Sequence, residues 1–567
     1  MPLKQSPLIY TIFALIVSLI PYLAQGHPLS DDSIHGLIRV KEYQLALANR
    51  QFPPYWAEDL YGGFGSPIFL FYAPFYMFVA AIFYALTGSI IAGSMGAMCF
   101  FTVVSAIGIY LLVQETLGGK SSVNNCAARV AVYFFILNPY LIGDKFIRIA
   151  NSEFAALCLA PISLYGLIKI KKEPLYGSLL LAAGLALVIL AHNLTSLTII
   201  VMLLGIAPIL YWDSPWKKTW PFILGGLILG LLLSAFFWMP ALYYKDLVHV
   251  EQLTFGETDF HHHFKPVQTF FTSSSNISMG FLNLVVIIFA LLIFWITWNQ
   301  EKSAILKLIL CNLLFAFLLI FLQFESSLPL WENITYLSLF QFPWRMMGPL
   351  ALIISVLAGL LLPIYCKKRN ITTYGKLEFI ILSLCVINTL PLLTTKLSVS
   401  ENLNSRLTSV ISGNDIKRII FTTTEADEYL PKTAIMKLKH YGQENRSLLI
   451  DQGLFSMINV EKETGTEIKF NIKTSTPLSI EIKRWFFPGW QCVINNSACE
   501  IDISSNGLIL VQTIAGNNDI HLTLNPPFIR KILTRISFAA LLIWAVLMSV
   551  QLKKGAWLEQ RTISDNF

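Results

Sequence analysis

The sequence predicts a polytopic α-helical membrane protein with a C-terminal β-rich domain. Two observations predict this fold class. The chain has 567 residues, of which 55% are hydrophobic and only 13% are charged, and a soluble protein of this length could not bury so much apolar surface. Apolar runs of about 17–25 residues recur along most of the chain, and a helix of that length crosses the core of a bilayer.

About 12–13 segments have the length and composition of a membrane span. We expect the first to be a retained anchor rather than a cleaved signal peptide, because its apolar run is long. The segments are 8–25, 66–86, 89–113, 128–143, 152–170, 175–191, 195–212, 219–242, 279–298, 304–322, 346–365, 376–395 and 530–552.

Clusters of lysine and arginine orient these segments, because the cytoplasmic loops of membrane proteins are enriched in both residues. The clusters lie at 169–172, 217–218, 302–307, 367–369 and 553–554. Placed in the cytoplasm, they alternate regularly from the fifth segment onward. The loops 243–278 and 323–345 and the region 396–528 then face outward, and so does the first loop, 26–65.

The segment 66–86 does not fit this alternation. Lys4 and Lys120 are both expected inside, yet two apolar segments lie between the first loop and Lys120, where one crossing is required. Because 66–86 contains Pro67 and Pro74, we expect it to be re-entrant or interfacial and to pack near the first loop. The alternative is that both segments cross and that Lys120 lies outside.

The region 396–528 is polar and differs in character from the rest of the chain. Apolar and polar residues alternate in the runs 467–473, 478–483 and 519–524, and a period of two is typical of strands. Turn residues separate these runs, at 488–489, 495–496, 506–507 and 516–518. The pattern predicts a β-sandwich-like domain that follows a membrane domain (1–395) and precedes a final anchor and cytoplasmic tail (529–567).

The eight cysteines divide into two groups. Six lie in or beside apolar segments, where we expect small core residues. Cys492 and Cys499 instead flank a short polar stretch at the spacing of a β-hairpin. If this region is extracytoplasmic, they can form a disulfide. There is no cysteine and histidine spacing typical of a zinc site.

The first outer loop has the chemistry of a site. Asp31 and Asp32 precede His35 and Arg39. One interpretation is that the two acids are solvated or cap a helix that begins near Ser33. The other is that one of them is the general base that deprotonates a hydroxyl acceptor. The residues alone leave both interpretations open.

Further charged or polar residues lie between later apolar segments. Arg148 and Glu153 occupy a short connection, where charges near membrane depth indicate a functional site, although local ion pairs at an interface are the alternative. His192 and Asn193 fit a hydrogen-bonded helix end. Arg345 follows Trp344 at the start of a span, where it either snorkels to the interface or grips a lipid phosphate with two hydrogen bonds.

The net charge of +7 does not indicate a nucleic-acid partner, because the basic residues fall in cytoplasmic loops. The stretch 257–263 contains three adjacent histidines with two acids. Its spacing matches no familiar zinc site, so we expect a mobile polar loop there and no assigned metal ligand. A divalent metal cofactor stays open.

Several motifs occur in the order found in one family. The chain resembles the bacterial membrane proteins labelled 6-pyruvoyl-tetrahydropterin-synthase-related, which are similar to GT-C glycosyltransferases. Nothing in the residues suggests pterin chemistry. The motifs are Asp31-Asp32-Ser-Ile-His35 with Arg39, Phe52-Pro-Pro-Tyr-Trp56, Gly65-Ser-Pro67, Phe71-Tyr-Ala-Pro74, Arg148 with Glu153-Phe-Ala-Ala, Ala191-His-Asn-Leu-Thr195, Ser234-Ala-Phe-Phe-Trp-Met-Pro240, Phe342-Pro-Trp-Arg345, Glu428-Tyr-Leu-Pro431 and Phe487-Pro-Gly-Trp490.

The resemblance implies a GT-C-like membrane domain, an acidic residue on the first outer loop and a polyprenyl-phosphate sugar as donor. Carried over, the acid is Asp31 or Asp32, and we favour Asp32 because it lies three residues before His35. His35, Arg39, Arg148, Glu153, His192, Asn193 and Arg345 would then bind substrate. One departure stands out: Ile-Ala-Asn follows Arg148, where a glycine is expected soon after the arginine.

The expected function is therefore an inverting glycosyltransferase in the bacterial inner membrane, which moves a sugar from a lipid-linked donor to an extracytoplasmic acceptor. The alternatives are a transporter or flippase of a lipid-linked saccharide and a catalytically inactive scaffold of the same fold. A transporter would carry its charges near mid-membrane on broken helices. The sugar, the polyprenol, the acceptor and the oligomeric state are not specified by the sequence.

Overall fold

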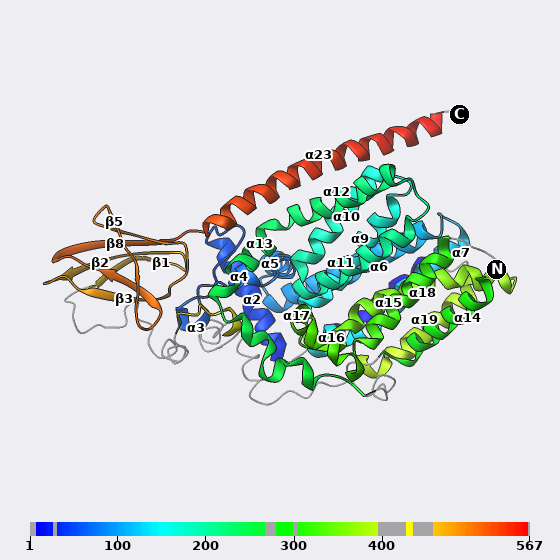
Figure 1. Ribbon diagram of the computed structural model, residues 1–567, viewed down its shortest axis with the longest axis horizontal. Coiled ribbons are helices and arrows are strands. Elements are labelled where there is room, and N and C mark those ends of the chain that lie inside the picture. The colour runs from blue at the N-terminus through cyan, green and yellow to red at the C-terminus, as the bar shows by residue number, and fades with distance from the viewer. Residues whose placement is uncertain are drawn as a thin grey trace.

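The computed structural model describes residues 7–25, 31–266, 279–298, 304–394, 427–434 and 458–564. A bundle of helices forms one end of the molecule and a small β-domain forms the other (Figure 1). Both chain termini lie at the end of the bundle far from the β-domain, and the C-terminal helix α23 runs along the outside of the bundle from the β-domain to that end. The predicted fold class is confirmed.

The helices follow the predicted apolar segments closely, with short helices between them. The first part of the chain contains α1 (Pro7–Gln25), α2 (Asp31–Ala48), α3 (Leu60–Gly63), α4 (Ile68–Phe71), α5 (Phe75–Thr87), α6 (Ile90–Thr116), α7 (Ser122–Ile136), α8 (Pro139–Gly143), α9 (Asn151–Lys169), α10 (Pro174–Ala191) and α11 (Asn193–Leu210). The second part contains α12 (Trp216–Leu233), α13 (Ala235–Tyr244), α14 (Phe281–Thr297), α15 (Ala304–Phe321), α16 (Leu328–Asn333), α17 (Thr335–Ser338), α18 (Met347–Lys368), α19 (Tyr374–Leu393) and α23 (Phe528–Ser564).

The number of helices long enough to span a membrane is smaller than the number of spanning segments that the sequence predicts. Among the described residues, eight are long and apolar enough to cross a bilayer, and ten are if each of two bent helix pairs counts as one span. Three further apolar helices are shorter, and they coincide with the predicted segments 8–25, 66–86 and 279–298. The apolar runs thus all become helices, but helix breaks shorten some of them.

The segment 66–86 is interrupted, as we expected from its prolines. It consists of α4 and α5, which are separated at residues 72–74. The 13 residues of α5 span about 20 Å at 1.5 Å per residue, which is less than the ~30 Å hydrocarbon core of a bilayer. This length agrees with a segment that does not cross the whole membrane.

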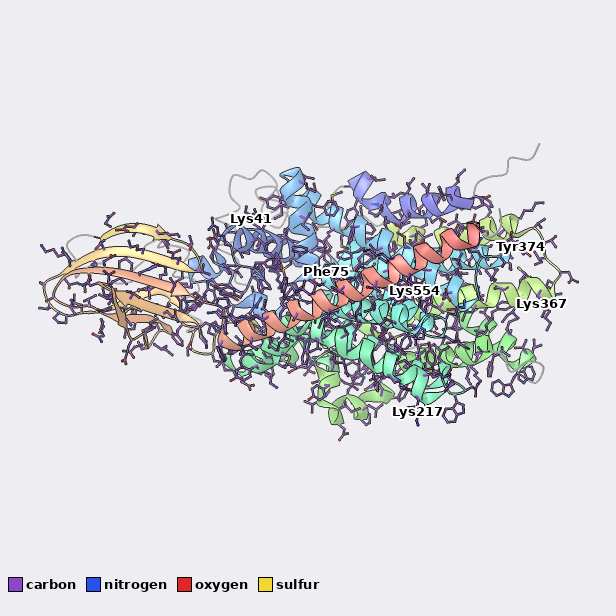
Figure 2. The ribbon with its side chains drawn as sticks, turned by 90° about the horizontal axis from the view of Figure 1, so that it is seen from above. Lys41, Phe75, Lys217, Lys367, Tyr374 and Lys554 are labelled. Atoms are coloured by element: carbon purple, nitrogen blue, oxygen red, sulfur yellow. A yellow bond between two sulfur atoms is a disulfide. The ribbon has the colours of Figure 1, made fainter. Side chains whose placement is uncertain are left out.

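Three of the basic clusters lie toward one end of the bundle. Lys217, Lys367 and Lys554 lie in the half of the molecule away from the β-domain, whereas Lys41 on α2 lies near the β-domain (Figure 2). This separation agrees with the predicted alternation of inner and outer loops. It also means that α9 and α18, which end at basic clusters, begin at the end that faces the β-domain.

One buried ion pair near the predicted inner side was not predicted. The guanidinium of Arg129 on α7 donates two hydrogen bonds of 2.7 Å to the carboxylate of Glu378 on α19. The hydroxyl of Tyr133 donates a third to the same carboxylate at 2.7 Å. Because Glu378 is only 2% exposed, the three hydrogen bonds stabilise a charge that would be costly to bury alone, and they join α19 to α7.

The β-domain consists of two antiparallel sheets. Its strands are β1 (Ile458–Glu463), β2 (Glu467–Thr474), β3 (Ser479–Trp485), β4 (Trp490–Ile494), β5 (Ser497–Cys499), β6 (Asp502–Ile503), β7 (Leu508–Gln512) and β8 (Gly516–Leu524). The order is β1-β2-β8-β4-β5 in one sheet and β3-β7-β6 in the other. Alternate residues such as Ile468, Phe470 and Ile472 are buried, so the predicted period of two reflects one buried face on each strand.

The predicted turn at residues 516–518 is wrong, because these residues begin β8. The chain turns just before them, and the side chain of Asn518 holds that turn. Its Oδ1 accepts a hydrogen bond from the backbone nitrogen of Ile514 at 2.9 Å, and its Nδ2 donates to the carbonyl of Ile514 at 2.8 Å. Asparagine thus stabilises the turn from within the strand.

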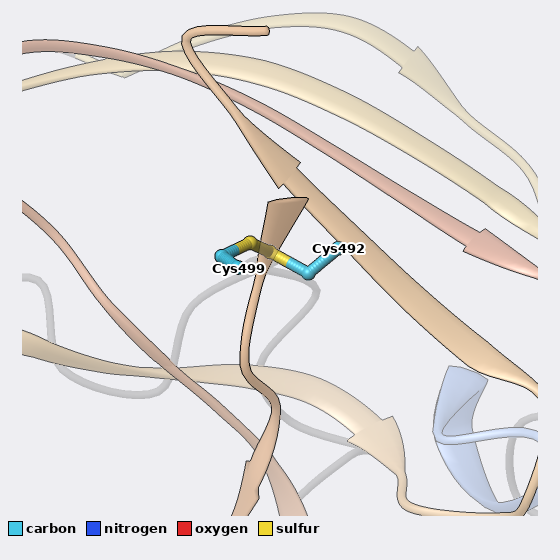
Figure 3. The surroundings of a disulfide bond; sticks show 2 residues. All are labelled: Cys492 and Cys499. Carbon is cyan, nitrogen blue, oxygen red and sulfur yellow. A yellow bond between two sulfur atoms is a disulfide. The ribbon is translucent and has the colours of Figure 1, made fainter. Parts of the chain in front are cut away.

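Cys492 and Cys499 form a disulfide (Figure 3). They lie directly opposite each other in the β4–β5 hairpin, with Cα atoms 5.1 Å apart. Asn495 and Asn496 make the two-residue turn and both have positive φ, 49° and 66°. Asparagine tolerates this conformation, which the tightest hairpin turns require. The hairpin register therefore places the two thiols in bonding position.

We predict that Cys492 and Cys499 are oxidised in protein taken from the membrane. The physical reason is the hairpin register together with the extracytoplasmic location that we expect for the β-domain, where disulfides persist. Mass spectrometry of unreduced, alkylated protein should recover the two cysteines in one linked peptide, while Cys126 and Cys385, which are buried in the bundle, should appear as free thiols. Two alkylated thiols at 492 and 499 would contradict both the bond and the location.

The first outer loop is fixed against the β-domain, and several motifs of the predicted family meet there. Trp56 packs against Phe487 and Trp490, with ring centres 6.5 and 6.3 Å apart. Gly65 adopts φ +82°, and a β-carbon there would clash with the indole of Trp56, so only glycine fits. The hydroxyl of Tyr55 donates a hydrogen bond of 2.6 Å to the carbonyl of Leu524.

Arg530 on α23 fixes the same loop from the other side. Its guanidinium is 2% exposed and donates hydrogen bonds to the carbonyls of Pro53, Pro54 and Phe69, at 3.3, 2.5 and 3.4 Å. These carbonyls compensate for the burial of the charge. The first loop is thus held between α23 and the β-domain.

Candidate functional site

The candidate site begins at a break in the helix that follows α6. Between α7 and α8, the side chain of Asn138 accepts a hydrogen bond from the backbone nitrogen of Tyr140 at 3.0 Å, and Pro139 occupies the first turn of α8, where its missing N–H costs nothing. The two helical parts are bent by 43°. The π-helix η1 (Asp144–Arg148) then continues α8, and π-helical turns are frequent at functional sites.

The residue after Arg148 explains the departure noted in the sequence. Ile149 has φ 59° and ψ 37°, a left-handed conformation that is a genuine outlier for a β-branched residue. Glycine would adopt it without strain. The reversal at Ile149 lets α9 begin at Asn151, and it brings Glu153 back to Arg148, whose Nη2 lies 3.3 Å from Oε2 of the glutamate. The chain therefore makes this reversal with an isoleucine at a position that would suit the expected glycine.

Glu153 is the centre of the site. Its carboxylate is 4% exposed and contacts two guanidiniums, because Nε of Arg345 lies 3.3 Å from the same Oε2 that faces Arg148. The hydroxyl of Tyr140 donates a hydrogen bond of 2.5 Å to the other oxygen, Oε1. Arg148 also pairs with Asp144. The two arginines from the connection and the outer loop, far apart in sequence, thus meet at one carboxylate.

The side chain of Arg345 is largely enclosed by protein groups. It is 15% exposed, and its Nη1 donates hydrogen bonds to Oε1 of Gln341 at 2.8 Å and to the carbonyl of Phe340 at 3.0 Å. The guanidinium of Arg148 lies over the ring of Trp344, 4.3 Å from its centre. Among the described residues, no acceptor binds Nη2 of Arg345. A guanidinium has five N–H donors, of which the two on Nη1 make these hydrogen bonds. Nε lies 3.3 Å from Glu153 without a hydrogen bond, so the two donors of Nη2 are the ones without an acceptor among the described residues and available to an anion.

One face of α2, in the first outer loop, contacts the start of the helix that carries Glu153. Asp31 and Asp32 are the first two residues of α2, and their side chains lie outside the described part of the structure. At 3.6 residues per turn, position 32 falls on the same face as Gly36, Arg39 and Tyr43. Position 31 is rotated away from that face by roughly 100°. His35 is partly buried beside it.

This face of α2 contacts elements of the site along its length. A β-carbon at Gly36 would lie 3.3 Å from Nδ2 of Asn151. The guanidinium carbon of Arg39 lies 4.3 Å from the centre of the Tyr72 ring. Tyr43 packs edge-on against Phe69, with ring centres 5.1 Å apart. Asn151 is the first residue of α9 and lies two residues before Glu153. Position 32 is therefore one turn from a contact with the helix that carries Glu153.

His192 and Asn193 behave as a helix end. His192 caps α11 with Nδ1, which accepts a hydrogen bond from the backbone nitrogen of Thr195 at 3.2 Å. This nitrogen therefore carries no proton. The ring is close enough to Glu153 for an electrostatic interaction. Asn193 donates a hydrogen bond of 3.0 Å to the carbonyl of Phe71, which joins α11 to the end of α4.

A short segment before the β-domain also reaches the site. The ring of Tyr429 stacks on Phe71, with centres 5.9 Å apart and planes 7° apart. Its hydroxyl is within electrostatic range of both Arg39 and Arg345, and burial raises the pKa of this phenol above its usual value. The segment is anchored by a β-bridge between Pro431 and Val248. The motif at 428–431 thus belongs to the site.

The histidine loop contains a hydrogen-bonded pair. His261 lies 2.6 Å from Asp259 and 3.6 Å from Glu332. The hydrogen bond to Asp259 raises the pKa of His261. Within the ranges that the structure describes, no group of three or more histidine, cysteine, aspartate or glutamate side chains is placed to hold a metal ion. The divalent metal that the sequence left open remains untested.

Some site residues could not be found from the sequence. Arg39, Arg148, Glu153 and Arg345 are charges in apolar surroundings, a signal that the sequence displays. Tyr140, Gln341 and Tyr429 are neutral polar residues near an interface, where such residues are ordinary. Their only signals are the Asn-Pro break before Tyr140 and the Glu428-Tyr-Leu-Pro motif.

No family model matches the chain, and no curated protein matches it in sequence. The resemblance to the 6-pyruvoyl-tetrahydropterin-synthase-related proteins therefore stays a prediction. Among solved structures, the chain is similar to the arabinofuranosyltransferase AftD from Mycobacteria, with 15% identity and a TM-score of 0.43 over 72% of this chain and 28% of AftD.

Two other solved structures are similar at the same level. One is the Archaeoglobus fulgidus oligosaccharyltransferase tethered with an acceptor peptide, at 12% identity and a TM-score of 0.45 over 75% of this chain and 60% of that one. The other is ArnT from Cupriavidus metallidurans bound to undecaprenyl phosphate, at 12% identity and a TM-score of 0.37 over 77% and 75%. The chain thus spans less than two thirds of AftD and of the oligosaccharyltransferase.

Proposed function

We propose that the protein is an inverting membrane glycosyltransferase that moves a sugar from a polyprenyl-phosphate donor to a hydroxyl acceptor outside the cytoplasm. The observation that carries the proposal is the meeting of two features at one end of the bundle. The helical face that carries position 32 contacts the start of α9, and the start of α9 carries the carboxylate shared by Arg148 and Arg345. The proposed base and the two arginines proposed to bind the phosphate would thus lie on neighbouring elements.

The proposed chemistry needs no further acid. The acceptor oxygen attacks the anomeric carbon and forms a bond to it, while the bond from that carbon to the phosphate oxygen breaks. Polyprenyl phosphate leaves with the electron pair, and the acceptor proton goes to the carboxylate of Asp32. A glycosidase must protonate a much poorer leaving group. Here the leaving group is already an anion, which Arg345 and Arg148 stabilise.

The location of the charges supports an enzyme over a flippase. α9 and α18 run from the cluster to basic residues at their other ends, Lys169 and Lys367–Lys368. The cluster therefore lies at one end of the bundle, beside the first outer loop and the β-domain. A transporter that rocks about a central site would need its charges near the midplane. We propose accordingly that the β-domain and the site face outward.

The proposal predicts a specific interaction with the phosphate of a polyprenyl lipid. Full-length protein in detergent should bind undecaprenyl phosphate about tenfold or more tightly than undecaprenol, because hydrogen bonds to a charged group contribute about 1.5–3 kcal/mol. Microscale thermophoresis with both lipids at equal detergent concentration measures the ratio. Equal affinity for the alcohol and the phosphate would count against a donor of this class.

A further inference from the structure

We propose that Gln341 is a positioning residue that sets the guanidinium of Arg345 for the donor phosphate. This inference rests on the proposed function and adds a residue that none of the sequence motifs contains. Gln341 lies between α17 and the 3-10 helix η8 (Pro343–Met346) that carries Arg345. It is 8% exposed, so its polar side chain is enclosed by protein and must be satisfied there.

The amide of Gln341 joins Arg345 to a distant outer loop. Its Oε1 accepts a hydrogen bond from Nη1 of Arg345 at 2.8 Å, and its Nε2 donates one of 2.8 Å to the carbonyl of Leu253. The orientation of the amide is unambiguous, because a guanidinium can only donate and a carbonyl can only accept. A side chain with one donor and one acceptor is thus required, and glutamate or leucine could not make both contacts.

These contacts determine which way the guanidinium points. Nη1 of Arg345 has two N–H groups, and Oε1 of Gln341 and the carbonyl of Phe340 accept from them at 2.8 and 3.0 Å. With Nη1 held, Nε lies 3.3 Å from Glu153, and Nη2 is the part of the fork that can meet a ligand. Without Gln341, the guanidinium could rotate away from this arrangement and bind an anion less well.

The backbone of Gln341 adopts a conformation that is unusual for glutamine. Its φ is +62°, in the left-handed region where glycine and asparagine are much more common than glutamine. If the residue only formed a turn, glycine would be the easier choice. Strained backbone conformations concentrate at ligand-binding and active sites, where the surrounding structure holds them. The strain at Gln341 supports a role for the amide.

The decisive variant is Gln341→Gly, which removes the side-chain amide while glycine adopts the positive φ of this position without strain. Binding of undecaprenyl phosphate to full-length protein in detergent should weaken about tenfold, as expected for the loss of one hydrogen bond to a charged group, while the thermal unfolding midpoint stays near that of the wild type. Asn370 also has a positive φ, 52°, but follows the far end of α18. Asn370→Gly is therefore the matched control and should leave binding unchanged.

A double variant tests whether Gln341 acts through Arg345. In an Arg345→Ala background, Gln341→Gly should weaken binding no further, because the group it positions is absent. An equal loss in both backgrounds, or wild-type affinity in Gln341→Gly, would overturn the positioning role while leaving the proposed function intact. If wild-type protein binds undecaprenol as tightly as undecaprenyl phosphate, the proposed function fails and the role of Gln341 in donor binding fails with it.

Discussion

Asp32→Asn protein should lose about 10²–10⁴-fold in the rate of sugar transfer, the contribution typical of a positioned general base. Asparagine has the shape of aspartate but cannot take the acceptor proton. Position 32 lies on the face of α2 that contacts the start of α9, so the substitution removes the base from the proposed site and keeps a side chain of the same shape. The measurement is release of undecaprenyl phosphate from undecaprenyl-phosphate-linked sugars by protein reconstituted in liposomes.

Asp31→Asn is the matched control for this prediction. The two aspartates are adjacent, yet position 31 is rotated by roughly 100° from the face that carries Gly36 and Arg39. Asp31→Asn should therefore keep most of the transfer activity and at most weaken the start of α2 by the loss of a negative charge from its first turn. Full activity in both folded variants would refute a catalytic carboxylate on the first outer loop.

The membrane part of the fold could be predicted because hydropathy determines where spanning helices lie. Every predicted apolar segment contains helix. The breaks between α7 and α8 and between α12 and α13 were not predicted. The bend after α7 depends on Asn138 capping the helix that Pro139 begins, and the 67° bend between α12 and α13 falls at Ser234. Both occur within uninterrupted apolar runs, where a hydropathy pattern records no change.

The candidate site was predictable only in its charged residues. Arg148, Glu153 and Arg345 are expensive to place near a membrane, so their presence indicates a role. The tertiary structure brings these residues together, because the left-handed turn at Ile149 returns the chain toward Arg148. Gln341 contacts the carbonyl of Leu253, which lies 88 residues away in the sequence, and no local sequence pattern predicts such a contact.

The β-domain was predictable for a different reason. Its strands have one buried face, so alternation in the sequence survives in the structure, as in β2, where Ile468, Phe470 and Ile472 are buried. The hairpin of Cys492 and Cys499 followed from spacing alone. The attachment of the domain to the first loop did not, because it rests on aromatic contacts such as Phe64 stacked on Trp485, with ring centres 4.6 Å apart.

Arg345→Ala should reduce transfer activity by about 100-fold or more, and Arg345→Lys by about tenfold, while both proteins fold. The guanidinium fork can donate two charge-assisted hydrogen bonds to a phosphate, whereas an ammonium offers a point charge. Removal of two hydrogen bonds to a charged group, at about 1.5–3 kcal/mol each, accounts for a loss of this order. Folding should survive because Glu153 keeps Arg148 as a partner.

The control for Arg345 lies at the other end of the same helix. Arg369 is exposed and follows the last residue of α18, so Arg369→Ala removes an arginine from α18 without touching the site and should transfer sugar at the wild-type rate. The two Arg345 variants should raise the KM for the lipid-linked donor more than that for the acceptor, since the arginine is proposed to contact the phosphate alone. Wild-type kinetics in Arg345→Ala would mean that the contact with Glu153 is purely structural. An equal rise in both KM values would instead indicate a general distortion of the site, and the donor would then have to be held by Arg148 and its neighbours without Arg345.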